Sequence, residues 1–165
     1  MIFLGVAGYG FFRAGNIRKR YEELLYIQRI LWMLRGEINY NLSSMSEVFH
    51  IISLRLKEPY KKIFYDFAVE LDKHAGVLFY EIWKEKVIKP LGTVIGCERD
   101  LDRLLEMGEN LGFLDKEMQM NYIDLFLENF NQSLREKQEK VQNEEKLNKM
   151  MGVLGGIFFV VFLWQ

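Results

Sequence analysis

The sequence predicts an all-α fold, a helical bundle of about six helices in which two long helices lead to apolar N- and C-terminal membrane segments. Three observations support this class. Only two prolines, Pro59 and Pro90, occur among the 165 residues. No stretch alternates apolar and polar residues for long enough to make a convincing strand. Apolar residues instead recur at spacings of three and four, which places them on one face of a helix.

The first and last helices are predicted to be the long ones. No proline interrupts the stretch from Ile2 to Tyr40, which as a helix would be about 58 Å long. The last helix is predicted from Lys116 to Trp164, about 73 Å long, with Asp115 as its capping residue. Their predicted core faces are Leu24, Ile27, Leu31, Leu34 and Ile38 in the first helix, and Ile123, Leu127, Phe130 and Leu134 in the last.

Two shorter helices are predicted directly after the first. Ser44 and Glu47 have the spacing of a capping box, in which the serine oxygen accepts a backbone N–H, and this favours a helix from Met45 to Leu56. Pro59 suits the first turn of the next helix, where its missing N–H costs nothing. Gly76 is predicted to end that helix.

Two further helices are predicted before the last one. A helical stretch from Val77 to Ile88 is expected to be broken at Pro90 and the residues around it. Another runs from about Glu98 to Glu109, and Gly112 is placed to terminate it in a left-handed conformation. The aromatic residues predicted to join the core are Trp32, Phe64, Phe67, Phe79, Trp83, Phe126 and Phe130.

The charges of the chain are balanced in number but not in position. The 22 basic and 23 acidic side chains leave a net charge of −1, which excludes a strongly basic nucleic-acid-binding protein. All of them lie between Arg13 and Lys149, so the mean hydropathy of −0.07 hides two apolar ends. We therefore predict an N-terminal apolar membrane segment over residues 1–15, a cytoplasmic helical bundle over 16–149 and a C-terminal transmembrane segment over 150–165.

Basic residues flank both apolar ends on the side of the charged middle. Arg18, Lys19 and Arg20 follow the first apolar segment, and Lys146 and Lys149 precede the last. Positive charge marks the cytoplasmic side of a membrane segment, so both flanks predict a cytoplasmic middle region. The first apolar run is short for a membrane span. The alternative is a soluble helical protein whose apolar ends pack together as core.

No motif in the chain indicates catalysis, a cofactor, a metal or a small-molecule substrate. His50 and His74 have no helical metal-ligand spacing, and a single Cys97 cannot form an intramolecular disulfide. Carboxylate pairs such as Glu81 with Glu85 leave a membrane-tethered helical enzyme as an alternative, although such pairs usually form a solvated helix face. The prediction is therefore a protein that is not an enzyme and binds no cofactor.

Glu37 is the one acidic residue with two interpretations. It lies between apolar positions of the first helix, so it could be a buried carboxylate that binds a partner. The alternative is a side chain on the polar edge of that helix, because buried glutamate is rare unless it is paired.

Three groups of residues, spread over nearly the whole chain, carry a resemblance to a known family. On these residues the sequence resembles the stage III sporulation protein AB family of endospore-forming bacteria, which is related to the cytoplasmic domain of the type II secretion platform protein F. The groups are Leu34, Glu37, Ile38 and Tyr40 in the first helix; Gly108, Glu109, Leu111, Gly112 and Asp115 at the turn before the last helix; and Lys149, Met150, Leu154 and Gly155 entering the final apolar segment.

The resemblance implies a place in the channel complex between mother cell and forespore. The helical domain would face the cytoplasm on the mother-cell side of the forespore outer membrane and dock a partner ATPase, stage III sporulation protein AA. The membrane segments would contact other membrane proteins of the channel complex. The residues that the resemblance nominates for partner binding are Glu37, Tyr40, Glu109, Gly112 and Asp115.

Overall fold

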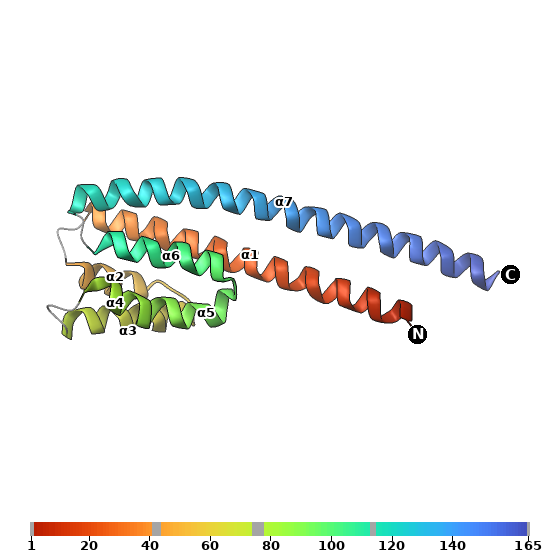
Figure 1. Ribbon diagram of the computed structural model, residues 1–165, viewed down its shortest axis with the longest axis horizontal. Coiled ribbons are helices and arrows are strands. Elements are labelled where there is room, and N and C mark those ends of the chain that lie inside the picture. Colours follow the sequence, from red (N-terminus) through yellow and green to blue (C-terminus); the bar gives the residue numbers. More distant parts are fainter. Residues whose placement is uncertain (1, 41–43, 74–77, 113–114, 165) are drawn as a thin grey trace. The chain divides into compact units, whose positions relative to one another are not determined.

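The computed structural model describes residues 2–40, 44–73, 78–112 and 115–164, without the side chains of 2–14, 16, 145, 148–149 and 152–163. Over these residues the chain forms helices and short turns and contains no strand, which confirms the all-α class (Figure 1). Six continuous helical stretches are present in the described ranges, as predicted. They are α1 (Ile2–Tyr40), α2 (Met45–Ser53), α3 (Tyr60–Lys73), the run of α4 (Phe79–Trp83), η1 (Lys84–Ile88) and α5 (Lys89–Ile95), α6 (Glu98–Leu111) and α7 (Lys116–Leu163).

The chain divides into two compact units. One comprises Met1–Glu22 together with Gln132–Gln165, and the other, called the bundle below, comprises Glu23–Asn131. Over the part of the chain that the structure describes, we find no helix that combines the length and the apolar character of a membrane crossing. Most side chains of the two predicted membrane segments lie outside the described residues.

Within the bundle, α1 and α7 run side by side in opposite directions (Figure 1). Their predicted core faces are buried as expected. Polar contacts join the two helices: the Arg35 guanidinium donates to both carboxylate oxygens of Asp124, at 2.5 and 2.9 Å. The Gln28 amide likewise donates to the amide oxygen of Asn131. These pairs fix the register of one helix against the other.

An aromatic cluster fills the space between the shorter helices. Phe49 of α2 meets Phe67 of α3 edge to face, with ring centroids 4.9 Å apart, and Trp83 of α4 stacks on Phe79 at 6.1 Å. The Trp83 indole N–H donates to the backbone oxygen of Leu104 in α6, at 2.9 Å. The cluster therefore ties α2, α3, α4 and α6 together, and comprises Phe49, Phe64, Phe67, Phe79 and Trp83.

Two predicted core aromatics lie elsewhere. Trp32 is 49 % exposed, because α1 turns its Leu31 and Leu34 side inward and position 32 lies about 100° around the helix from position 31. Phe126 of α7 is only half-buried and stacks on the buried Phe130. Helical spacing, rather than residue size, decides which side chains enter this core.

The predicted break at Pro90 is wrong. The helix that begins at Phe79 continues through Pro90 to Ile95, because its turns widen into a π-helix over Lys84–Ile88, which ends two residues before the proline. The N–H of Lys89 accordingly bonds to the oxygen of Lys84, five residues back. A wider turn makes room for a residue that has no N–H and whose ring crowds the preceding turn. The helix ends at Gly96, which has the left-handed φ of 60°.

The left-handed conformation predicted for Gly112 is also wrong. Gly112 has φ −69° and ψ −19°, which are right-handed helical values. A Cβ at this position would lie 2.8 Å from Cβ of Phe79. Glycine is needed here because the end of α6 packs directly on the start of α4.

The remaining boundaries follow the sequence with small shifts. The Ser44 hydroxyl accepts the N–H of Glu47, at 3.3 Å, as the capping prediction requires. The helix after it ends at Ser53 rather than Leu56. Pro59 precedes α3 by one residue and accepts the N–H of Ile63, at 3.2 Å. The predicted stop at Gly76 lies outside the described residues.

Candidate functional site

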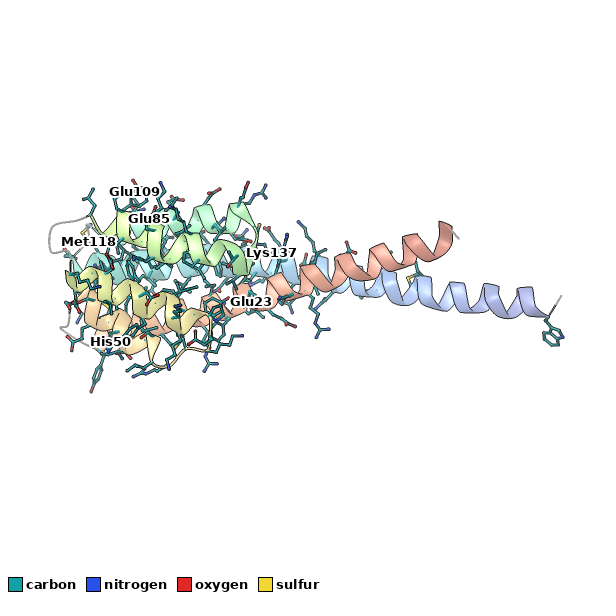
Figure 2. The ribbon with its side chains drawn as sticks, turned by 90° about the horizontal axis from the view of Figure 1, so that it is seen from below. Glu23, His50, Glu85, Glu109, Met118 and Lys137 are labelled. Carbon is teal, nitrogen blue, oxygen red and sulfur yellow. The ribbon has the colours of Figure 1, made fainter. Side chains whose placement is uncertain are left out.

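Four of the five residues nominated for partner binding lie at one end of the bundle, where α1 and α6 finish and α4 and α7 begin (Figure 1). Figure 2 shows Glu109 and Met118 at this end. We call it the helix-end surface. It consists of Tyr40, Leu78, Glu109, Gly112, Asp115, Glu117 and Met118, all of which are exposed.

Hydrogen bonds and close packing hold these helix ends together. The Lys116 ammonium at the start of α7 donates to the backbone oxygen of Asn39 in the last turn of α1, at 3.1 Å. The Gln119 amide in α7 donates to the backbone oxygen of Leu111, the last residue of α6, at 3.0 Å. With the contact between Gly112 and Phe79, these links connect the ends of α1, α7, α6 and α4 in turn.

Asp115 is confirmed as the cap of the last helix. Its carboxylate oxygen Oδ1 accepts the backbone N–H of Met118, at 2.9 Å, and its backbone oxygen accepts the N–H of Gln119. A carboxylate here satisfies a donor that the first turn leaves free and lies at the positive end of the helix dipole. Asp115 therefore stabilises the start of α7 and is at the same time exposed on the helix-end surface.

Three large apolar side chains are exposed on the helix-end surface. Tyr40 is 89 % exposed, Leu78 54 % and Met118 52 %. Leu78 and Met118 were missed by the sequence reasoning, which looked for charged and conformationally special residues there. Helical spacing does predict that Met118 is exposed, because it lies five residues from Ile123 and so falls off the predicted core face.

Exposed carboxylates, those of Glu109, Asp115 and Glu117, belong to the same helix ends as these apolar groups. Glu109 stands in the last turn of α6, where the helix carries no basic residue. A negative charge at a helix C-terminus opposes the dipole, so helix stability does not account for it. Burial raises the pKa of the neighbouring Tyr122, and the charges of Glu106 and Glu109 raise it further, against the hydrogen bond that Asn110 donates to its oxygen.

Glu37, the fifth nominated residue, is engaged within the bundle. Its side chain is 12 % exposed, and its carboxylate accepts a hydrogen bond from Nη1 of Arg55 at 2.7 Å. This ion pair joins the end of α1 to the turn after α2. The carboxylate is therefore mostly buried and paired with a residue of its own chain, and partner binding by Glu37 stays a prediction.

The groups considered for chemistry form no catalytic arrangement among the described residues. Glu81 and Glu85 are exposed, and Glu85 pairs with Lys89 at 2.6 Å. Over the same residues, no cluster of three or more His, Cys, Asp or Glu side chains could hold a metal ion. His50 lies on the surface against Tyr65, whereas His74 falls outside the described residues.

A buried tyrosine at the start of α3 is the strongest electrostatic feature that the sequence did not reveal. The Tyr60 hydroxyl is buried and donates to Oε2 of Glu23, at 2.7 Å. Burial and the adjacent carboxylate raise the pKa of Tyr60 far above its ordinary value. Tyr26 packs beside it, with ring centroids 4.8 Å apart, and accepts the N–H of Lys57. A phenol that stays protonated can fasten α1 to α3, which is a structural role.

Comparisons with known proteins agree with this fold. The family model described as stage III sporulation protein AB matches residues 1–164. Stage III sporulation protein AB of Bacillus subtilis (strain 168) is 25 % identical over 154 residues, which cover 93 % of this chain and 90 % of that protein. A solved structure described as stage III sporulation protein AB (SpoIIIAB) matches with a TM-score of 0.64 at 22 % identity, covering 75 % of this chain and 97 % of that one. At this identity the structural likeness supports the fold.

Proposed function

The chain belongs to the stage III sporulation protein AB family, and from this premise we propose that it is a non-enzymatic platform subunit of the channel complex between mother cell and forespore. The observation that carries the proposal is the family match over residues 1–164, which include both apolar ends and the whole bundle. A platform subunit acts by holding other proteins in place. Its chemistry is therefore that of packed surfaces rather than of an active site.

The bundle would dock the cytoplasmic ATPase of the complex, stage III sporulation protein AA. Two features of the described residues support a docking role. The interior is filled by apolar and aromatic side chains, and no buried side-chain polar atom in the described part lacks a hydrogen-bond partner. Exposed apolar side chains and exposed carboxylates also occur together on the helix-end surface, where they could contact a partner.

The two apolar ends would anchor the protein in the mother-cell side of the forespore outer membrane, with the bundle in the cytoplasm. This part of the proposal rests on the sequence, in which Met1–Phe12 and Met150–Trp164 carry no charge and basic residues flank the charged middle. Contacts with the other membrane proteins of the complex would be made by these ends. The chain would be recovered with membranes and resist extraction by high salt, and release by salt alone would contradict the anchor.

Binding to the ATPase is the direct test of the platform function. The full-length chain, reconstituted in lipid nanodiscs, should bind purified stage III sporulation protein AA, and empty nanodiscs should not. Absence of binding by the full-length chain would overturn the docking function. Substituting both Glu81 and Glu85 by alanine should leave sporulation intact, and its loss would favour the membrane-tethered enzyme instead.

A further inference from the structure

We propose that the outer face of the α1–α7 pair joins two copies of this chain, with α1 of each copy lying on α7 of the other and Arg29 pairing with Glu128 of the second copy. This outer face comprises Leu25, Arg29 and Trp32 of α1 and Asn121 and Glu128 of α7, all of them exposed on the bundle. The inference goes beyond the docking of an ATPase. It rests on the proposed function only for the direction of the symmetry axis, which follows from a shared membrane.

Two large apolar side chains are exposed on one stripe of α1. Trp32 is 49 % exposed and Leu25 is 38 % exposed, and the seven residues between them make about two turns. The two side chains therefore leave the helix in the same direction, one before and one after the exposed Arg29. Tryptophan is enriched among the residues that carry most of the energy of protein interfaces. The stripe thus has the composition of an interface rather than of a solvated helix face.

Two polar contacts show which residues of α1 and α7 lie at the same height along the helices. Gln28 bonds to Asn131, and the next such pair lies seven residues farther along each helix. Arg29 follows Gln28 by one residue, and Glu128 is three residues from Asn131 in the same direction. The heights of Arg29 and Glu128 therefore differ by two residues, which is about 3 Å along the helices.

The proposed membrane anchor fixes the direction of the symmetry axis. The contact between Gln28 and Asn131 shows that α1 enters and α7 leaves the bundle at the same end. Two copies in one membrane are then related by a twofold axis parallel to these helices. In that arrangement α1 of one copy faces α7 of the other at equal height. Each Arg29 lies within about 3 Å in height of Glu128 of the second copy, a difference that two long side chains span, and symmetry forms the pair twice.

The charges of the outer face suit a second copy better than a partner of one charge sign. By helical spacing, the charged side chains of α1 and α7 that border this face are Arg29, Arg35, Lys116, Glu117, Asp124 and Glu128. They are basic and acidic in equal number, and Arg35 pairs with Asp124. Arg29 and Glu128 form no ion pair within the part of the chain that the structure describes. A second copy offers each of them an opposite charge, whereas a uniformly acidic or basic partner would repel one of them.

Self-association of the purified full-length chain in detergent, measured by sedimentation equilibrium, tests the apolar part of the contact. The wild type should form a dimer, and Trp32→Ala should raise the dissociation constant of the dimer about tenfold or more, the effect of removing a central interface residue. Tyr65→Ala removes an exposed aromatic side chain of α3 and, as the matched control, should leave the dissociation constant unchanged. Thermal unfolding verifies that both variants fold. A monomeric wild type, or equal dissociation constants for the wild type and Trp32→Ala, would overturn the proposal.

Charge reversal tests the pairing of Arg29 with Glu128. Arg29→Glu and Glu128→Arg should each weaken self-association, because both contacts of each variant dimer would then join like charges. An equimolar mixture of the two variants should regain the affinity of the wild type, since both contacts of the mixed dimer join opposite charges. Arg99→Glu and Glu106→Arg, at exposed positions of α6, are the matched controls and should leave self-association unchanged.

The mixture distinguishes a contact between copies from a contact within one copy. If the two charge variants do not associate with each other, the pairing of Arg29 with Glu128 is wrong and the proposed dimer with it. The dimer and the docking function can also fail separately. A monomeric wild type that still binds stage III sporulation protein AA would overturn the dimer alone, and a dimer with the expected variant effects that does not bind it would overturn the docking function alone.

Discussion

The two halves of the bundle are held together by different means. The aromatic cluster joins α2, α3, α4 and α6 through packed rings, all buried except the half-buried Phe79, with Trp83 at its centre and its indole N–H bonded to Leu104. The contact between α1 and α7 has a Leu and Ile core with polar pairs along its edge, Arg35 with Asp124 and Gln28 with Asn131. The stability of the aromatic cluster depends on how closely the rings fit together. The stability of the α1–α7 contact depends on which residues of the two helices lie opposite one another.

This difference reflects the lengths of the helices. A helix of five to fourteen residues has few side chains with which to fix its position, so large rings that interlock with glycines must do so. Long helices have a continuous apolar seam that permits sliding, and an occasional polar pair at the edge selects one alignment. Substitutions in the cluster should therefore change stability strongly, and those in the α1–α7 pair should change it weakly and in a salt-dependent way.

Trp83→Ala should produce the largest loss of stability. The indole is fully buried against Phe67 and Phe79 and bonded to Leu104. Removing it would cost about 3 to 5 kcal/mol, as for other buried aromatic residues. Urea unfolding of the purified full-length chain would measure this. A loss below about 1 kcal/mol would show that the cluster is not the stabilising half of the bundle.

Gly108→Ala should give the next largest effect. A Cβ at position 108 would overlap atoms Cδ1, Nε1 and Cγ of Trp83, and overpacking of this kind costs about 1 to 3 kcal/mol. Gly36→Ala is the matched control, because a Cβ there meets nothing within 4 Å and alanine favours a helix over glycine by about 0.5 to 1 kcal/mol.

The two glycine substitutions should therefore have opposite signs in the same unfolding measurement. In the Trp83→Ala background, Gly108→Ala should lose its cost and become neutral to slightly stabilising, since the overlapping ring is gone and alanine favours the helix. The same cost in both backgrounds would contradict the packing explanation.

Asp115→Ala should have a moderate effect. The carboxylate accepts the N–H of Met118 at the start of α7, and loss of such a cap costs about 1 kcal/mol. Asp115→Asn keeps an acceptor oxygen and should restore most of the stability, as judged from thermal unfolding. If asparagine destabilises as much as alanine, the carboxylate has a role other than capping.

The sequence was sufficient for the features that depend on local periodicity. The core faces of α1 and α7, the cap at Asp115 and the Ser44 cap all follow from spacing and residue type. The continuation through Pro90 was not predictable in the same way, because it depends on a π-turn that other helices support. Gly112 was misread since its small size serves a contact with Phe79, and contacts between distant segments leave no local pattern.

The candidate site divides in the same way, into features that follow from local sequence and features that depend on the fold. Tyr40, Glu109, Gly112 and Asp115 were nominated from the sequence, but no spacing rule indicates that the ends of α1, α4, α6 and α7 meet at one place. Leu78 and Met118 were missed because the sequence reasoning looked for charged and conformationally special residues there. Helical spacing places Met118 off the core face, whereas the exposure of Leu78 is seen only in the fold.

The smallest expected effect comes from the ion pair between α1 and α7, and pH distinguishes it from packing. Arg35 holds the pKa of Asp124 below its ordinary value. The carboxylate is thus more easily ionised in the folded protein than in the unfolded chain, so the pair stabilises the fold fully above a pH of about 4. This stabilisation is lost as the pH falls through the lowered pKa. The two side chains are 35 % and 41 % exposed, so water and salt screen the pair and its effect should be smaller than that of the Asp115 cap.

Asp124→Asn should lower the stability of the protein slightly at pH 7 and should match the stability of the wild type at low pH. Added salt should shrink the difference at pH 7. A deficit that persists at low pH and high salt would mean that Asp124 contributes through packing, and the contrast between the two halves of the bundle would then be lost.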